Sequence, residues 1–251
     1  GTDSASFRLL VDRNTVTLAG KGDQGTLCAA YELLEQLGVR WCIPGELGTV
    51  VPELQTVALR RQDTSQDPAF ALRDFANSIR YPEWRAWARR LRLGGEYLGG
   101  HGLPFTADPA AEPELFVQVD GHPTHQLRLS HPEVLRRTVA ACRQQLARQP
   151  DLRYLSLGPA DGEGFGSDPW DAGDVDPLHG SVSVTDRLVR FFNLVLADLH
   201  RDYPDVGLAF YCYSAYLRPP VRERPDPRLL PVFAPIDCCR LHSIDNPLCW
   251  E

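Results

Sequence analysis

The 251-residue chain contains no methionine and a single lysine, Lys21. Because its first residue is not Met, we expect an internal piece of a longer protein, and the opening Gly-Thr-Asp-Ser lacks the charged start and apolar run of a signal peptide. No stretch approaches the roughly 18 consecutive apolar residues of a membrane-spanning helix. The net charge of −7 argues against a nucleic-acid-binding domain, which would carry an excess of basic residues.

Cysteine is present, but not in the pattern of a disulfide scaffold. The chain has seven Cys, an odd number spread over its whole length. Cys28 and Cys142 fall in apolar helical patterns, which favours buried thiols. Thiolates and an imidazole, the side chains that bind zinc, gather near the end of the chain without a regular zinc spacing. We therefore predict no metal and no cofactor, with zinc or a disulfide as alternatives for Cys238, Cys239, His242 and Cys249.

The first 59 residues have the pattern of a small α+β domain. Alternating apolar residues predict two strands, and apolar residues at helical spacing predict a helix that ends before Gly38. The glycine-rich corner at 20–25 fits neither phosphate-binding glycine motif, which excludes nucleotide binding there. The predicted order is β-β-α-β, with strands at 7–11, 15–18 and 39–43 and a helix at 27–37.

A polar stretch over 60–68 predicts a linker, and a different pattern follows it. From residue 69 onward, apolar runs alternate with longer amphipathic helices, which is typical of βα units and parallel strands. The segment 98–126 is rich in Gly, Pro and His and predicts a long loop. Residues 69–251 are fewer than the roughly 250 of an eight-unit barrel. The fold class is therefore α/β, a small α+β domain followed by an incomplete (β/α) TIM-type barrel with four or five parallel strands.

Several motifs resemble known families. Residues 25–41, with Gly25-Thr26-Leu27-Cys28-Ala29 and Leu37-Gly38-Val39-Arg40-Trp41, resemble the small N-terminal domain that precedes the barrel in alpha-glucuronidases and in hexosaminidases of glycoside hydrolase family 20. The rest of the chain resembles domain-of-unknown-function family 4838. The matching pieces include Trp87-Ala88-Arg89-Arg90-Leu91-Arg92-Leu93-Gly94-Gly95, Leu155-Ser156-Leu157-Gly158-Pro159-Ala160-Asp161-Gly162 and Ala234-Pro235-Ile236-Asp237-Cys238-Cys239-Arg240-Leu241-His242.

The resemblance implies a carbohydrate-active enzyme that hydrolyses O-glycosidic bonds of poly- or oligosaccharides, with a secreted or periplasmic location. The expected partner is a carbohydrate substrate, without nucleic acid. A non-catalytic carbohydrate-binding module on a degenerate barrel is the alternative, and a metalloprotein built on the late Cys/His group is a third hypothesis. That family commonly has a Cys-rich stretch after its Asp-Gly pair, whereas residues 163–170 contain no Cys, so a metal role for that stretch does not carry over.

Two acidic residues after the strand predicted at 152–157 are the candidate catalytic groups. Glycoside hydrolysis uses two carboxyl groups, one to protonate the leaving oxygen and one as base or nucleophile. We predict Asp161 as the first choice and Glu163 as the second. Hexosaminidases have an adjacent Asp-Glu pair, whereas Gly162 separates the two acids here. The alternative is an Asp-Gly turn followed by a solvated Glu.

Six further residues lie at or just past the predicted carboxyl ends of strands, where a barrel builds its active site. Aromatic rings there could stack on sugar faces, or they could belong to the core. If the barrel prediction is right, these side chains converge with the two acids on one face. The predicted substrate-binding residues are Asn77, His101, Tyr211, Tyr213, Asp237 and His242.

Overall fold

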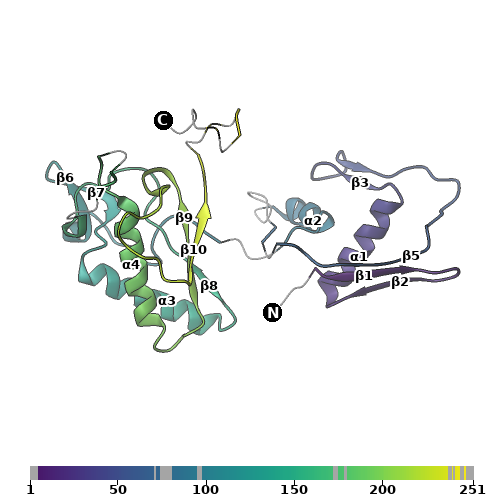
Figure 1. The fold of residues 1–251 in the computed structure, drawn as a ribbon, viewed down its shortest axis with the longest axis horizontal. Helices are drawn as coiled ribbons and strands as arrows, with labels where there is room; N and C mark the ends of the chain where they lie inside the picture. Colours follow the sequence, from purple (N-terminus) through teal and green to yellow (C-terminus); the bar gives the residue numbers. More distant parts are fainter. Residues whose placement is uncertain are drawn as a thin grey trace. The chain divides into compact units, whose positions relative to one another are not determined.

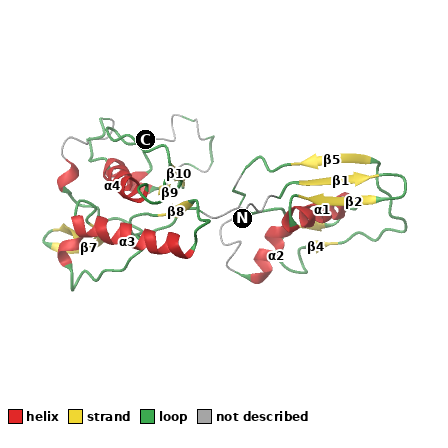
Figure 2. Ribbon diagram, turned by 90° about the horizontal axis from the view of Figure 1, so that it is seen from below, coloured by secondary structure: helices red, strands yellow, loops and turns green. Residues whose placement is uncertain are grey.

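The computed structural model describes residues 5–70, 72–73, 81–94, 98–171, 175–177, 180–236, 239, 241–243 and 246. Figure 1 labels the helices and strands of its mixed α/β fold, and Figure 2 colours them by type. The strands of the described residues form several small sheets, and none of these sheets closes into a barrel. The chain divides into two units, Gly1–Tyr97 and Leu98–Glu251.

The first unit is built on an antiparallel sheet in the order β2-β1-β5. Its middle strand alternates strictly, with Phe7, Leu9 and Val11 buried, so one face of the sheet forms a core with Cys28 and Ala29 of the helix α1. The predicted first two strands and helix are thereby confirmed. The elements of the sheet and its helix are β1 (Phe7–Val11), β2 (Val16–Gly20), β5 (Gln62–Gln66) and α1 (Asp23–Gln36).

The linker predicted over 60–68 is wrong for most of its length, because β5 lies inside it. β5 pairs antiparallel with β1 in the register Leu9↔Thr64, and Arg8 forms an ion pair with Asp63 at 2.7 Å. The strand sits at the sheet edge and carries polar side chains throughout, which is why its composition is that of a linker. Backbone pairing with β1, which composition does not reveal, makes it a strand.

The described residues of the first unit contain three smaller elements as well. The strand predicted at 39–43 is shorter in the structure and pairs antiparallel with a second short strand. A short helix follows later in the unit, and the indole nitrogen of Trp87 on it donates a hydrogen bond to the carbonyl of Trp41 at 2.9 Å. Their bounds are β3 (Arg40–Trp41), β4 (Thr49–Val50) and α2 (Pro82–Arg90).

The second unit contains a parallel sheet in the order β10-β9-β8. Two long helices supply most of its core, and Figure 1 shows both beside the sheet. The largest side chains of this core, including Phe191 and Phe192, are fully buried. The elements are β8 (Tyr154–Ser156), β9 (Gly207–Cys212), β10 (Leu229–Phe233), α3 (Pro132–Arg148) and α4 (Val184–Leu199).

The described residues of this unit contain three parallel strands, fewer than the four or five predicted. Residues 71 and 74–80, in the first part of the predicted barrel, lie outside the described residues. The long loop predicted over 98–126 is wrong in part, since it contains an antiparallel hairpin of β6 (Phe116–Val119) and β7 (His122–Leu127). Asp120 and Gly121 join the two strands with positive φ values of 51° and 77°, as an Asp-Gly hairpin turn requires.

A buried carboxylate at the start of α4 holds the segment before β10. Asp186 is fully buried and accepts hydrogen bonds from the backbone N–H groups of Val221, Arg222 and Glu223. Burial by itself would raise the pKa of Asp186, but the bonds from Glu223, the Ser183 side chain, Val221 and Arg222 outweigh it and lower the pKa. The ionised form is therefore bound more strongly in the folded chain than in the unfolded one.

Replacing Asp186 by Asn is expected to lower the free energy of unfolding at neutral pH by about 1–3 kcal/mol, because the charged acceptor is lost. The lowered pKa of Asp186 stabilises the fold fully above about pH 4, and this contribution disappears as the pH falls through the folded-state pKa. Urea unfolding at a series of acidic pH values should therefore show a flatter pH dependence for Asp186→Asn than for the wild type. An unchanged slope would contradict this role.

Candidate functional site

The candidate site lies at the carboxyl end of the parallel sheet. After β8, the backbone N–H of Leu157 still bonds to the carbonyl of Ala209, and the chain then leaves the sheet toward Asp161. On the neighbouring strand β9, Tyr211 lies near the end and Tyr213 directly after it. Because β8 and β9 are parallel, their carboxyl ends meet at one edge, which is where open α/β sheets bind ligands.

A glycine-rich segment brings His101 to the same edge. The N–H of Gly99 donates to Oγ of Ser156 at 2.9 Å, and Gly102 exchanges backbone hydrogen bonds with Gly158 and Pro159 at 3.1 and 2.7 Å. Gly99 has a φ of +107°, and a Cβ atom there would collide with the ring of Tyr211. Glycine is therefore required for this segment to lie against the end of β8 and β9.

Four of the predicted residues form one group, which we call the His101 cluster: His101, Asp161, Tyr211 and Tyr213. Nε2 of His101 lies 3.6 Å from Oδ1 of Asp161. The imidazole ring packs edge-on against Tyr211 and Tyr213, with ring centroids 5.3 and 5.4 Å apart. Residues more than 100 positions apart in the sequence thus meet at the end of the sheet, as the parallel-strand topology predicts.

The cluster combines an accessible carboxylate with a supported imidazole. The Asp161 side chain is 66% exposed and that of His101 is 31% exposed, so solvent or a ligand can reach both. Oδ1 of Asp161 also accepts the N–H of Gly162 at 2.9 Å, which makes the turn that the sequence offers as the alternative interpretation. The turn contact and the imidazole contact therefore involve the same carboxylate oxygen, Oδ1.

The cluster rests on Tyr216, which sequence reasoning missed. Tyr216 is buried, and its ring packs against those of Tyr213 and Phe165, with centroids 6.1 and 5.8 Å away. Burial raises the pKa of Tyr216, and the negative charge of Asp161 raises it further, so the phenol stays protonated. The sequence signal that could have pointed to Tyr216 is its close spacing to Tyr211 and Tyr213.

The remaining predicted residues stand apart from the cluster or outside the described residues. Glu163 is exposed, and within the described residues the structure brings Asp161, but not Glu163, to His101. Nδ1 of His242 lies 3.4 Å from Sγ of Cys239. Asn77 and Asp237 are outside the described residues, as are Cys238 and Cys249.

Comparison with known protein families gives a match over most of the chain. Residues 43–249 match the model of the family described as Domain of unknown function (DUF4838). The chain belongs to this family. The match begins within the first unit, upstream of the predicted start of the barrel at residue 69. No curated protein matches the chain.

In this DUF4838 chain, three successive residues of β7 hold the loop that carries the two acids. Buried Gln126 uses its side-chain Nε2 to donate to the carbonyls of Ala160 and Glu163 at 2.8 and 3.2 Å. Nε2 of His125 lies 2.9 Å from the carbonyl of Asp161, and the Thr124 hydroxyl donates to Gly164 at 3.0 Å. The hairpin that the sequence analysis missed therefore fixes the backbone on both sides of Asp161.

Replacing Gln126 by Leu is expected to loosen residues 160–164, because the carbonyls of Ala160 and Glu163 would lose a donor. Amide hydrogen exchange in this loop should become about tenfold faster or more, while exchange in α4 stays unchanged. Gln144→Leu, at an exposed position on α3, is the matched control and should leave the loop as it is. Equal exchange in the two variants would show that Gln126 does not hold the loop.

The acidic residues farther along the same loop make contacts that stabilise the fold. Arg187 of α4 is buried and bonds both carboxylate oxygens of Asp171, at 3.0 and 2.6 Å, and the carbonyls of Phe165 and Gly166. Asp168 accepts a hydrogen bond from the Ser130 hydroxyl at 2.9 Å.

Within the described residues of this DUF4838 chain, no group of three His, Cys, Asp or Glu side chains is arranged to hold a metal ion. No helix among them is long and apolar enough to cross a bilayer.

Proposed function

We propose that the chain hydrolyses O-glycosidic bonds of poly- or oligosaccharides, with Asp161 as its acid/base carboxylate. The observation that carries this proposal is the His101 cluster, which joins an exposed carboxylate to an imidazole and two tyrosines at the carboxyl end of a parallel sheet. Active sites of (β/α) folds occupy this position. Tyrosine rings offer apolar faces for a sugar ring and hydroxyls for its polar edge.

The proposed reaction follows from the chemistry of carboxyl groups. A protonated carboxyl donates its proton to the leaving oxygen as the glycosidic bond breaks, and a second carboxylate activates water or attacks the sugar. Asp161 takes the first role, and Glu163, on the same exposed loop, is the nearest candidate in the sequence for the second. His101, 3.6 Å from Asp161, is suited to orient that carboxylate and to exchange protons with it.

Two finer assignments of fold belong to the same proposal. We propose that β8, β9 and β10 are part of an incomplete TIM-type barrel, since they are parallel and α4 connects β8 to β9. We also propose that the first unit is related to the N-terminal domain of alpha-glucuronidases and family-20 hexosaminidases. The sheet β2-β1-β5 with α1 against it supports this relationship.

A non-catalytic carbohydrate-binding module is the second candidate function. It is favoured by the high exposure of Asp161 and by its bond to Gly162, both of which fit a turn that merely contacts a sugar. The two functions differ in one respect, because only the hydrolase turns its ligand over.

The test uses the purified chain with a panel of 4-nitrophenyl glycosides and, in parallel, with unlabelled oligosaccharides in isothermal titration calorimetry. Release of 4-nitrophenol from one or more glycosides supports the hydrolase. Oligosaccharide binding without release of nitrophenol supports the binding module. Neither binding nor turnover across the panel would contradict a carbohydrate function.

A further inference from the structure

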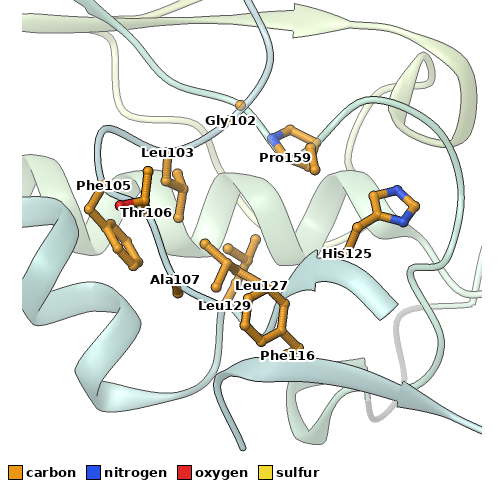
Figure 3. A pocket seen from close by; sticks show the side chains of 12 residues that line it. Gly102, Leu103, Phe105, Thr106, Ala107, Phe116, His125, Leu127, Leu129 and Pro159 are labelled. Carbon is orange, nitrogen blue, oxygen red and sulfur yellow. The ribbon is translucent and has the colours of Figure 1, made fainter. Parts of the chain in front are cut away.

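A cavity of about 200 Å³ lies beside the loop that carries Asp161 (Figure 3). Its side walls are apolar and come from two places. Leu103 and Phe105 belong to the segment that follows His101, whereas Phe116 and Leu127 belong to the β6–β7 hairpin. Figure 3 shows these side chains gathered around the same space, with Pro159 above them and the imidazole of His125 at one end.

The size and polarity of the cavity define the group that fits it. An apolar cavity of about 150 Å³ stays dry and takes up benzene. A space of 200 Å³ with leucine and phenylalanine walls therefore suits one aromatic ring with a small substituent, and it is too small for an additional sugar ring with its hydration. His125, at one end of the cavity, adds a polar group to the lining, which suits a phenolic oxygen at that edge of the ring.

The cavity is adjacent in the chain to the His101 cluster. Gly102 and Ala160 line it, and they are the immediate neighbours of His101 and Asp161. These two lining segments are joined by the backbone bonds of Gly102 with Gly158 and Pro159. His125, which lines the cavity, also contacts the carbonyl of Asp161 at 2.9 Å. These contacts place the cavity next to the loop that carries the Asp161 carboxylate.

We infer that this cavity binds a single-ring aromatic group, which in the substrate is the aglycone next to the scissile glycosidic bond. The second half of this inference rests on the proposed hydrolase function. The favoured substrates are thus phenolic glycosides, with the sugar on the tyrosines of the His101 cluster and the aromatic ring between the hairpin and the segment 103–107.

The test measures binding of 4-nitrophenol and of a 4-nitrophenyl glycoside by ligand-observed NMR and calorimetry. Ala107→Leu adds volume to a wall of the cavity, and we expect it to weaken the binding of 4-nitrophenol about tenfold or more. Ala140→Leu, at an exposed position on α3, is the matched control and should bind as the wild type does. Leu127→Phe fills the cavity from the hairpin and should give the same loss if Ala107→Leu does not fold.

The glycoside should bind more tightly than 4-nitrophenol and compete with it, because it occupies both places. The cavity assignment would be overturned if 4-nitrophenol does not bind at millimolar concentration. It would also be overturned if 4-nitrophenol binds equally well to Ala107→Leu and Ala140→Leu. A glycoside no tighter than 4-nitrophenol would overturn the aglycone assignment. If Ala107→Leu loses 4-nitrophenol binding but no glycoside is turned over, the assignment of the aromatic site stands and the hydrolase function is refuted.

Discussion

Asp161→Asn is expected to lower the rate of aryl-glycoside hydrolysis by a factor of about 10² to 10⁴, the contribution typical of a positioned general acid or base. Asparagine keeps the shape of the side chain and can still accept the N–H of Gly162, so the turn is preserved. It cannot donate or take up the catalytic proton. The measurement is the release of 4-nitrophenol under substrate saturation, with the melting temperature recorded for each variant.

Asp151→Asn provides the matched control, since Asp151 is exposed and lies before β8 rather than after it. This control should retain full activity. Asp161→Asn should retain its melting temperature and its oligosaccharide affinity within about threefold, because the tyrosines are untouched. Equal turnover by the two variants would exclude Asp161 as the acid/base group.

Arg187→Met is expected to have the largest effect on stability, with a loss of about 3–5 kcal/mol in the free energy of unfolding. The Arg187 side chain is only 3% exposed and its partner Asp171 is 10% exposed, so methionine would leave a buried carboxylate without its cation. The carbonyls of Phe165 and Gly166 would lose their donors as well. Thermal unfolding should show a melting temperature lower by about 10 °C.

Two further variants separate this ion pair from arginine loss in general. Arg201→Met removes an exposed arginine that lies 3.6 Å from Asp198, and it should cost less than about 1 kcal/mol. The double variant Asp171→Asn/Arg187→Met removes both buried charges and should recover part of the stability lost by Arg187→Met. If Arg187→Met and Arg201→Met melt at the same temperature, the buried ion pair does not hold the loop.

Periodicity predicted the elements whose burial is one-sided. The strand β1 and the helix α3 each show regular apolar spacing, because each packs one face on a core. β5 was missed because an edge strand with polar side chains has no apolar period. The hairpin β6–β7 was missed although Asp120-Gly121 is a hairpin signal, since the glycines, prolines and histidines around it dominate the composition.

The start of α3 shows how tertiary contacts decide local detail. Serine is a common helix cap, but the hydroxyl of Ser130, which precedes the helix, bonds to the carboxylate of Asp168. Nδ1 of His131 accepts the N–H of Glu133 at 3.2 Å and serves as the cap. A partner 38 residues away in the sequence thus decided which side chain closes the helix.

The His101 cluster was predictable because parallel strands bring their carboxyl ends together whatever their separation in sequence. That topological argument selects Asp161, Tyr211 and Tyr213 from their positions after or near the ends of strands. It does not find Gln126 or Tyr216, because these act through packing and backbone hydrogen bonds from other segments. Residues that support a site from other segments are therefore harder to predict from the sequence than residues at strand ends.

The most direct test of the central claim is a crystal structure of the chain soaked with an oligosaccharide identified in the binding screen. We expect a sugar ring in contact with Tyr211 or Tyr213 and a sugar hydroxyl or glycosidic oxygen within hydrogen-bonding distance of the Asp161 carboxylate. A sugar bound away from the carboxyl ends of β8 and β9, with Asp161 still facing solvent, would contradict the assignment of this site.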